Sequence, residues 1–142
     1  MYKGVYGRTS GQRWTMDHPI SKHIYSLKQL LEREGAKVVL FGKFENEYVA
    51  GQYDGNTGTI TIDCPRALDA LGTLAHEGGH FMAHKLLGDI LPDPIREQRE
   101  LLADVFGWEL LIRIGAADRV ISWIQFREGK CNEEHKKPDE QE

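Results

Sequence analysis

The segment from Leu74 to Met82 reads LAHEGGHFM and holds the motif HExxH, with two histidines four residues apart and Glu77 directly after the first. In an α-helix, positions i and i+4 lie one turn apart on the same face, so His76 and His80 are expected to point at one ion. Two neutral imidazoles suit Zn²⁺ and leave room for a third ligand and a water, whose proton a nearby carboxylate can take. The segment therefore requires a helix with one face on a core and these three side chains on its open side.

This helix is predicted to begin at Asp63, which is followed by Cys64-Pro65, and to end at Gly88. At about 100° per residue its apolar positions fall on one side, away from the histidines. These positions are Leu68, Leu71, Ala75, Met82 and Leu86. Gly78 and Gly79 flank this stripe and predict the close approach of another backbone. The alternative is that the glycines only loosen the helix.

A second predicted helix supplies a third ligand. It begins at Asp93-Pro94 and ends near Ile114, before Gly115. Glu100 and Asp104 share one of its faces, beside an apolar stripe that is expected to pack on the first helix: Leu101, Val105, Trp108 and Ile112. Glu100 would then complete a site of two histidines and one glutamate, and Asp104 would accept a hydrogen bond from a ligand imidazole. The alternative is a solvated acidic edge among Arg96, Glu97, Arg99 and Glu109.

The order of these motifs, HExxH followed by Glu-x-x-x-Asp, resembles that of the gluzincin metallopeptidases. The segments His76-Glu-Gly-Gly-His80 and Glu100-Leu-Leu-Ala-Asp-Val-Phe106 resemble the ImmA/IrrE family more narrowly, and the similarity spans roughly residues 20 to 115. The resemblance implies that His76, His80 and Glu100 bind zinc. It also implies that Glu77 is the catalytic carboxylate and that Asp104 supports a ligand. For substrates it implies regulatory cleavage, often of a repressor encoded nearby by a phage or mobile element.

The other segments complete an α+β, zincin-like domain over residues 18–128. They predict a helix from Ile20 to Glu34 that ends at Gly35, and three strands at residues 37–41, 45–53 and 59–62. An edge strand of this sheet is expected to bind a peptide by main-chain pairing, although the sequence does not say which strand that is. A helix from Ala117 to Phe126 is expected to cover the core. Residues 1–17 predict a flexible arm, and residues 129–142 predict a disordered polar tail.

Composition excludes several classes of protein. A chain of 142 residues with 40% hydrophobic residues fits one domain with a single core. A net charge of −4 argues against a general nucleic-acid surface. Two cysteines predict no disulfide framework and fit a reducing compartment. No apolar run reaches membrane-spanning length, and the first twenty residues lack the apolar core of a signal peptide, so a cytoplasmic location away from membranes is expected.

These observations predict a small zinc-dependent endopeptidase that acts on a protein or peptide, such as a repressor. Glu77 would take the proton of the attacking water and pass it to the leaving amine. The donor that stabilises the oxyanion stays open among Tyr48, Tyr53 and His84. Three alternatives also stay open: a zinc protein whose site only holds the fold or binds a partner, a zinc amide hydrolase with a non-peptide substrate, and a non-enzymatic regulator that binds a repressor by its edge strand. The native metal and the oligomeric state do not follow from the sequence.

Overall fold

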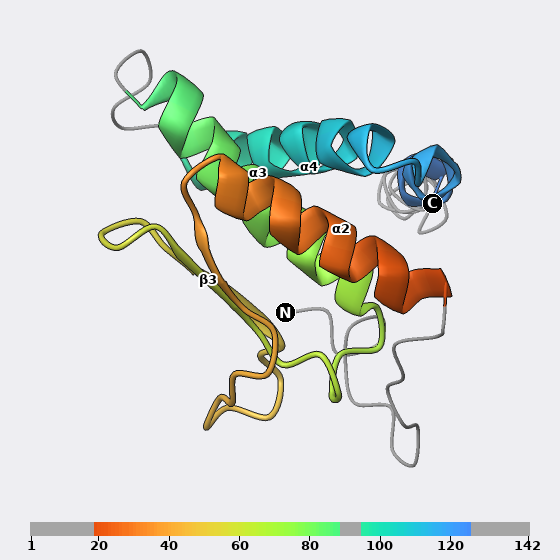
Figure 1. Cartoon of the computed structure of the whole chain (residues 1–142). Coiled ribbons are helices and arrows are strands. Elements are labelled where there is room, and N and C mark those ends of the chain that lie inside the picture. Colours follow the sequence, from red (N-terminus) through yellow and green to blue (C-terminus); the bar gives the residue numbers. More distant parts are fainter. Residues whose placement is uncertain (1–18, 89–94, 126–142) are drawn as a thin grey trace, which may run out of the picture.

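The computed structural model describes residues 19–88 and 95–125, so the predicted arm at 1–17 and tail at 129–142 lie outside it (Figure 1). The described elements are α2 (Pro19–Arg33), β1 (Lys37–Val39), β2 (Gly51–Asp54), β3 (Thr59–Ile62), α3 (Ala70–Leu87) and α4 (Arg96–Arg113), followed by a helical segment at 117–125. The predicted α+β class is confirmed. Within the described ranges, no helix has both the length and the apolar character needed to cross a membrane.

The sheet is small and mixed, with the strand order β1-β3-β2. β1 runs parallel to β3 and pairs Val38 with Ile60, whereas β2 runs antiparallel to β3 and pairs Tyr53 with the same residue. Because alternate side chains of a strand point to opposite faces, Ile60 and Ile62 are both fully buried against the helices. The prediction of three strands is confirmed, and β3 has the predicted bounds.

The predicted strand at 45–53 is wrong over most of its length, because the chain turns before β2 begins at Gly51. The side chain of Asn46 accepts a hydrogen bond from the Tyr48 N–H at 2.9 Å, and its carbonyl accepts one from the Val49 N–H at 3.1 Å. An asparagine that binds the backbone two residues later favours a turn over a strand. Only Gly51–Asp54 therefore pairs with β3.

The helices form layers over one side of the sheet. Figure 1 shows the strands on one side of α2 and α3, and α4 on the far side of α3 from the sheet. The core between these layers consists of apolar residues from every element, among which Ile24, Leu27, Leu31, Leu71 and Leu74 are fully buried. α3 is thus the central element, in contact with the sheet, with α2 and with α4.

All three predicted glycine stops follow the ends of their helices, although Gly88 after α3 keeps a right-handed φ of −54°. Gly35 after α2 and Gly115 after α4 have φ values of 106° and 85°, in the left-handed region that favours glycine. The next residue then donates a hydrogen bond to the carbonyl five positions earlier, from Ala36 at 3.0 Å and from Ala116 at 2.9 Å. This pattern is the standard closure of an α-helix by glycine.

The predicted start of α3 at Asp63 is wrong. Asp63 and Cys64 instead extend the sheet, because their N–H groups donate to the carbonyls of Ala50 at 2.9 Å and Leu40 at 3.1 Å. The helix begins at Ala70, and the side chain of Asp69 accepts a hydrogen bond from the Gly72 N–H at 2.9 Å. Leu68 therefore lies before the helix and is 40% exposed, and Leu86 near the other end of the predicted core stripe is 53% exposed.

The N-terminus of α4 also differs from the prediction. The helix begins at Arg96, with Ile95 as its N-cap residue. The proposed Asp93-Pro94 start lies outside the described residues. The Ile95 N–H donates to the side chain of Gln98 at 3.3 Å, which satisfies one of the N–H groups that a helix start leaves without a partner.

The face of α4 that packs on α3 is not the predicted apolar stripe, since Leu101, Val105 and Ile112 are 47%, 45% and 55% exposed. The packed face carries small residues instead. A Cβ on Gly107 would lie 2.7 Å from the carbonyl oxygen of Ala75, and a Cβ on Gly79 would collide with the carbonyl oxygen of Ala103. The close backbone approach predicted at Gly79 is therefore confirmed. Gly78 faces the side chains of Leu31 and Leu110 instead of a backbone.

We expect Gly79→Ala to lower the free energy of unfolding by about 2 kcal/mol, because the added methyl group meets backbone that cannot rotate away. The helical preference of alanine offsets only about 1 kcal/mol of the strain. Denaturant unfolding measures the change. Gly55→Ala is the matched control, since a Cβ there meets its nearest atoms at ordinary contact distances of 3.6 Å and more. A wild-type unfolding midpoint for Gly79→Ala would contradict the close contact between α3 and α4.

The helical segment 117–125 covers one end of the core, as predicted for that part of the chain. Val120 is buried, and Trp123 and Ile124 pack against the core, whereas Ile121 is 59% exposed. The guanidinium of Arg119 forms an ion pair with Asp69 at 2.6 Å. This ion pair joins the segment 117–125 to the N-cap residue of α3.

Candidate metal centre

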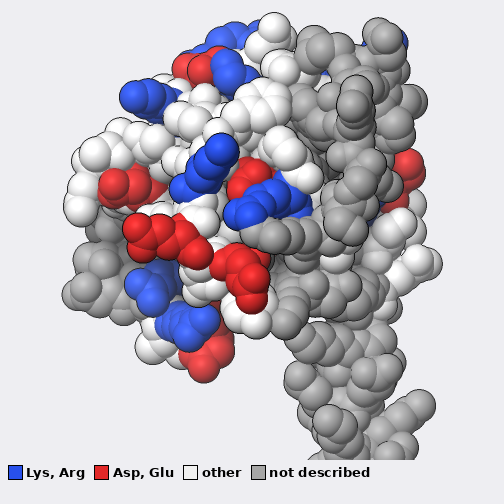
Figure 2. Space-filling model, turned by 90° about the horizontal axis from the view of Figure 1, so that it is seen from below, with Lys and Arg blue, Asp and Glu red and all other residues white. Residues whose placement is uncertain are grey.

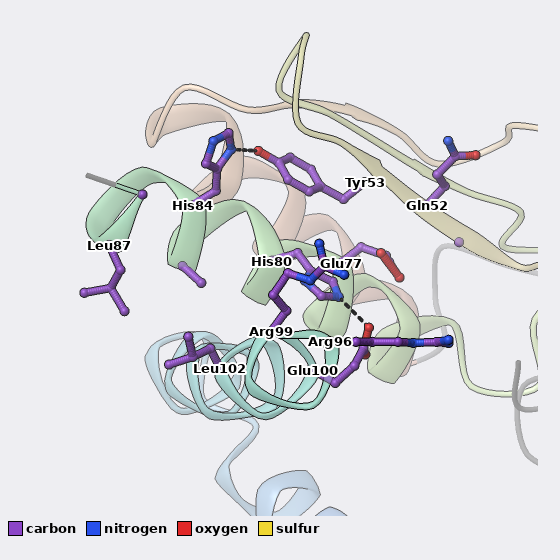
Figure 3. Close-up of a pocket in the computed structure, with 13 residues that line it drawn as sticks. Gln52, Tyr53, Glu77, His80, His84, Leu87, Arg96, Arg99, Glu100 and Leu102 are labelled. Atoms are coloured by element: carbon purple, nitrogen blue, oxygen red, sulfur yellow. Dashed lines mark hydrogen bonds and ion pairs between the residues drawn. The ribbon is translucent and has the colours of Figure 1, made fainter. Parts of the chain in front are cut away.

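His76 and His80 lie one turn apart on α3, and Glu100 faces them from α4. The Nε2 atom of His76 is 2.9 Å from one carboxylate oxygen of Glu100, and the Nε2 atom of His80 is 3.5 Å from the other. Figure 3 shows His80 and Glu100 meeting across the space between the two helices. The contact of Gly79 with Ala103 brings the helices close enough for this meeting, because both residues lie within one turn of the site.

The three side chains fit a divalent metal ion. One potential ligand atom from each of His76, His80 and Glu100 lies within 4.8 Å of the others, so the group can hold an ion. Ligands at about 2.0 to 2.2 Å from a tetrahedral zinc ion lie about 3.3 to 3.6 Å from one another, and each histidine lies 2.9 or 3.5 Å from one of the two Glu100 oxygens. Two imidazole nitrogens and one carboxylate are also a donor set that zinc accepts, although other divalent ions share it.

Asp104 holds the His76 ring from the side away from Glu100. It is buried, with 3% of its surface exposed, and its carboxylate lies 2.9 Å from the Nδ1 atom of His76. A carboxylate only accepts hydrogen bonds, so Nδ1 carries the proton and Nε2 is left to bind a metal. The predicted position of Asp104 next to a ligand imidazole is therefore the one seen in the structure.

We expect Asp104→Asn to weaken zinc binding by about 10- to 100-fold, because an uncharged amide replaces the carboxylate that orients the ring of His76 and raises its basicity. Competition with a chromogenic chelator measures the affinity. Asp118→Asn is the control, since Asp118 is an exposed aspartate outside the metal group. Equal zinc affinities for Asp104→Asn and the wild-type protein would show that the hydrogen bond does not support the site.

The carboxylates of Glu100 and Glu77 differ in their electrostatic surroundings. Hydrogen bonds from His76 and His80 hold the pKa of Glu100 well below its usual range. Burial raises the pKa of Glu77, an effect that the two histidines reduce and that Glu100 strengthens. Glu100 is thus ionised and interacts with the two histidines, whereas Glu77 is a stronger base than an exposed glutamate.

A pocket of about 670 Å³ lies beside the metal group. Its walls come from α3, α4 and β2, and they include Glu77, His80 and Glu100. Gly51 of β2 lies against the side chain of Glu77, because a Cβ at Gly51 would be 3.3 Å from the Cγ of Glu77. β2 is an edge strand of the sheet, and its residues Gly51, Gln52 and Tyr53 line this pocket. Of the two edge strands, β2 is the one that lines the site.

Two of the three candidate oxyanion donors lie in the pocket. The hydroxyl group of Tyr53 is 2.8 Å from the Nδ1 atom of His84, and both side chains line the wall formed by β2 and α3 (Figure 3). Burial, followed by the charge of Asp54, raises the pKa of Tyr53, so its hydroxyl group stays protonated at neutral pH. Tyr48 lies on the turn before β2 and is absent from the described lining of the pocket.

Comparison of the chain with protein-family models, with curated proteins and with solved structures found no match. The resemblance to the ImmA/IrrE family therefore remains a prediction from the motifs.

Three residues at the site were not predicted to belong there. Arg96 and Arg99 line the pocket, and the ring of Trp123 lies with its centroid 6.4 Å from that of His76. For Arg96 a signal was present, since positions 96 and 100 lie one turn apart on the same helix face, whereas Arg99 is adjacent to Glu100 and about 100° around the helix from it. For Trp123 there was none, because its place depends on how the segment 117–125 folds back on α3.

Proposed function

We propose that this protein is a small zinc-dependent endopeptidase. The observation that carries the proposal is that a metal-binding group of two histidines and one glutamate shares a pocket with Glu77. Three protein ligands leave a tetrahedral ion with one position for water, which is the arrangement of catalytic zinc sites, whereas structural zinc sites are closed by four protein ligands. In the described part of the chain, no fourth histidine, cysteine, aspartate or glutamate joins the group.

In the proposed mechanism His76, His80 and Glu100 hold zinc, which when bound lowers the pKa of a water and polarises the substrate carbonyl. Asp104 keeps the His76 ring in position through its hydrogen bond to Nδ1. Glu77 takes the proton of the attacking water and later donates it to the leaving amine. Burial raises the pKa of Glu77 above its usual range, which makes its carboxylate a better proton acceptor than that of an exposed glutamate.

Tyr53 and His84 supply a hydrogen-bond donor on the wall formed by β2 and α3. When the Tyr53 hydroxyl donates to the Nδ1 atom of His84, the Nε2 atom of His84 carries a proton and is itself a donor. Such a donor stabilises the negative charge that develops on the substrate carbonyl oxygen.

A peptide is the substrate class that this pocket fits best. The outer edge of β2 offers main-chain donors and acceptors to an extended peptide, and Gly51 places that edge against Glu77. A non-peptide amide would leave most of this edge unused. On the face seen in Figure 2, basic and acidic side chains are interspersed without a broad basic area of the kind that binds nucleic acid. A repressor-like protein in the cytoplasm, cleaved for regulation, is the substrate we propose.

Metal removal tests the proposed function. We expect the zinc-loaded protein to hydrolyse members of an internally quenched peptide library, a chelator to abolish the activity, and added Zn²⁺ to restore it, whereas Mg²⁺ does not. Circular dichroism should show a largely unchanged helix content without metal, because the core between the sheet and the helices does not include the metal group. Unfolding on metal removal, with no hydrolysis in any metal state, would favour a structural zinc site and overturn the proposal.

A further inference from the structure

Two arginines of the pocket have no acidic partner among the residues that the structure describes. Arg96 and Arg99 are exposed, lie in the first turn of α4 and line the pocket with Glu100. Figure 3 shows both side chains extending from α4, on the opposite side of the pocket from β2. Within residues 19–88 and 95–125, neither guanidinium lies within 4.0 Å of a carboxylate. Their charges are therefore available to a ligand in the pocket.

The positions of these arginines do not serve the stability of α4. A positive side chain in the first turn of a helix opposes the helix dipole, and two like charges three residues apart repel each other. Neither side chain packs in the core, since both residues are exposed. A contribution to binding accounts for their placement better than a contribution to folding.

The nearby carboxylates do not neutralise this wall of the pocket. Glu100 already interacts with His76 and His80, and these histidines, not the arginines, are what lower its pKa. A metal ion in the site would add further positive charge. A ligand with a carboxylate is therefore favoured over a neutral or cationic one, and a guanidinium suits it because its planar donors match both carboxylate oxygens.

We propose that Arg96 and Arg99 bind a carboxylate of the peptide substrate and so make the pocket selective for acidic peptides. This inference rests on the proposed function and adds a substrate class to it. A peptide strand paired with the edge of β2 would lie between β2 and α4. Alternate side chains of such a strand point in the same direction, so one in every two would face the arginines. The carboxylate comes either from an aspartate or glutamate side chain or from the C-terminus of the peptide.

Peptide pools that differ in one charge test the proposal. The probes are internally quenched peptides, amidated at the C-terminus, in which one position holds Glu, Gln or Lys and all others are neutral. We expect the wild-type protein to favour the best Glu pool over the matching Gln pool by about tenfold or more in kcat/KM, the factor typical of a hydrogen bond to a charged group. If a neutral pool with a free C-terminus is cleaved as fast as the best Glu pool, the carboxylate that the arginines bind is the C-terminus of the peptide.

The arginine variants assign the preference to these residues. In the double variant Arg96→Gln, Arg99→Gln, the ratio of Glu to Gln pools is expected to fall to within about twofold, and Arg99→Glu is expected to favour the Lys pool. Arg113→Gln is the matched control, because Arg113 is an exposed arginine at the other end of α4, beside Glu109. A preference that survives in the double variant, or no acidic preference in the wild-type protein, would overturn the proposal.

Binding measurements on a variant that does not hydrolyse peptides distinguish the failure of this proposal from the failure of the proposed function. Fluorescence anisotropy gives the Kd of each pool for the zinc-loaded Glu77→Gln protein. If the wild-type protein cleaves no pool but Glu77→Gln binds the Glu pool about tenfold more tightly than the Gln pool, carboxylate recognition stands and the peptidase proposal fails. If pools are cleaved without regard to charge, the peptidase proposal stands and the carboxylate proposal fails. If no pool is either bound or cleaved, both fail.

Discussion

Replacing Glu77 with glutamine is expected to lower kcat for peptide hydrolysis by about 10²- to 10⁴-fold, while zinc stays bound. Glu77 lines the pocket beside His80 and Glu100 but is not a member of the metal group, so its loss removes a proton acceptor and no ligand. Glutamine keeps the size and shape of the side chain. Because burial already raises the pKa of Glu77, a neutral side chain there is not expected to destabilise the fold.

Three measurements separate this role from others. Steady-state kinetics on the best library peptide gives kcat, zinc analysis of the purified protein gives the metal content, and circular dichroism checks the fold. Glu109→Gln is the matched control, since Glu109 is an exposed glutamate on α4 that interacts with Arg113. If Glu77→Gln holds zinc and hydrolyses peptide at the wild-type rate, Glu77 is not the general base. The mechanism would then need another proton acceptor.

The parts of the fold that the sequence predicts well depend on residues close together in the chain. His76 and His80 face the same way because they are one helical turn apart, and Gly35 and Gly115 end their helices through local hydrogen bonds. Strand β3 follows from four residues that alternate between its faces. The meeting of Glu100 with the histidine pair was expected from a motif pattern. Its physical cause, the small-residue contact at Gly79, was only partly visible in the sequence.

Two of the errors, the start of α3 and the packing face of α4, arise where residues far apart in the sequence decide the structure, whereas the error at residues 45–53 comes from the local turn at Asn46. Asp63, followed by Cys64-Pro65, matches the sequence pattern of a helix start. Its N–H group instead donates to the carbonyl of Ala50 in the sheet, and the helix begins after Asp69. The apolar stripe on α4 predicted the wrong packing face, because the steric fit of Gly107 against Ala75 brings the backbones closer than bulky side chains would allow. Arg96 and Arg99 were named only within the alternative of a solvated edge on α4, and their place in a pocket was not predicted. Their neighbours across the pocket, on β2, are far away in the sequence.

Replacing Glu100 with glutamine is expected to weaken zinc binding by more than about 100-fold. Loss of a residue that only supports a ligand lowers the metal affinity by about 10- to 100-fold. The loss of Glu100 is expected to be larger, because Glu100 is proposed to be a ligand itself and to supply the negative charge of the site. Its two carboxylate oxygens face the Nε2 atoms of His76 and His80 at 2.9 Å and 3.5 Å. An amide oxygen in their place carries no charge and is a poorer donor to zinc.

Chelator competition measures this loss, and the fluorescence of Trp123 offers a second readout, because its ring lies beside that of His76. Glu97→Gln is the matched control, since Glu97 is exposed in the same turn of α4 but lies outside the metal group. A Glu100→Gln protein that binds zinc as tightly as the wild-type protein would remove Glu100 from the ligand set. Two histidines on one helix would then be the only protein ligands in the described group, too few for the three-ligand centre on which the proposed hydrolysis depends.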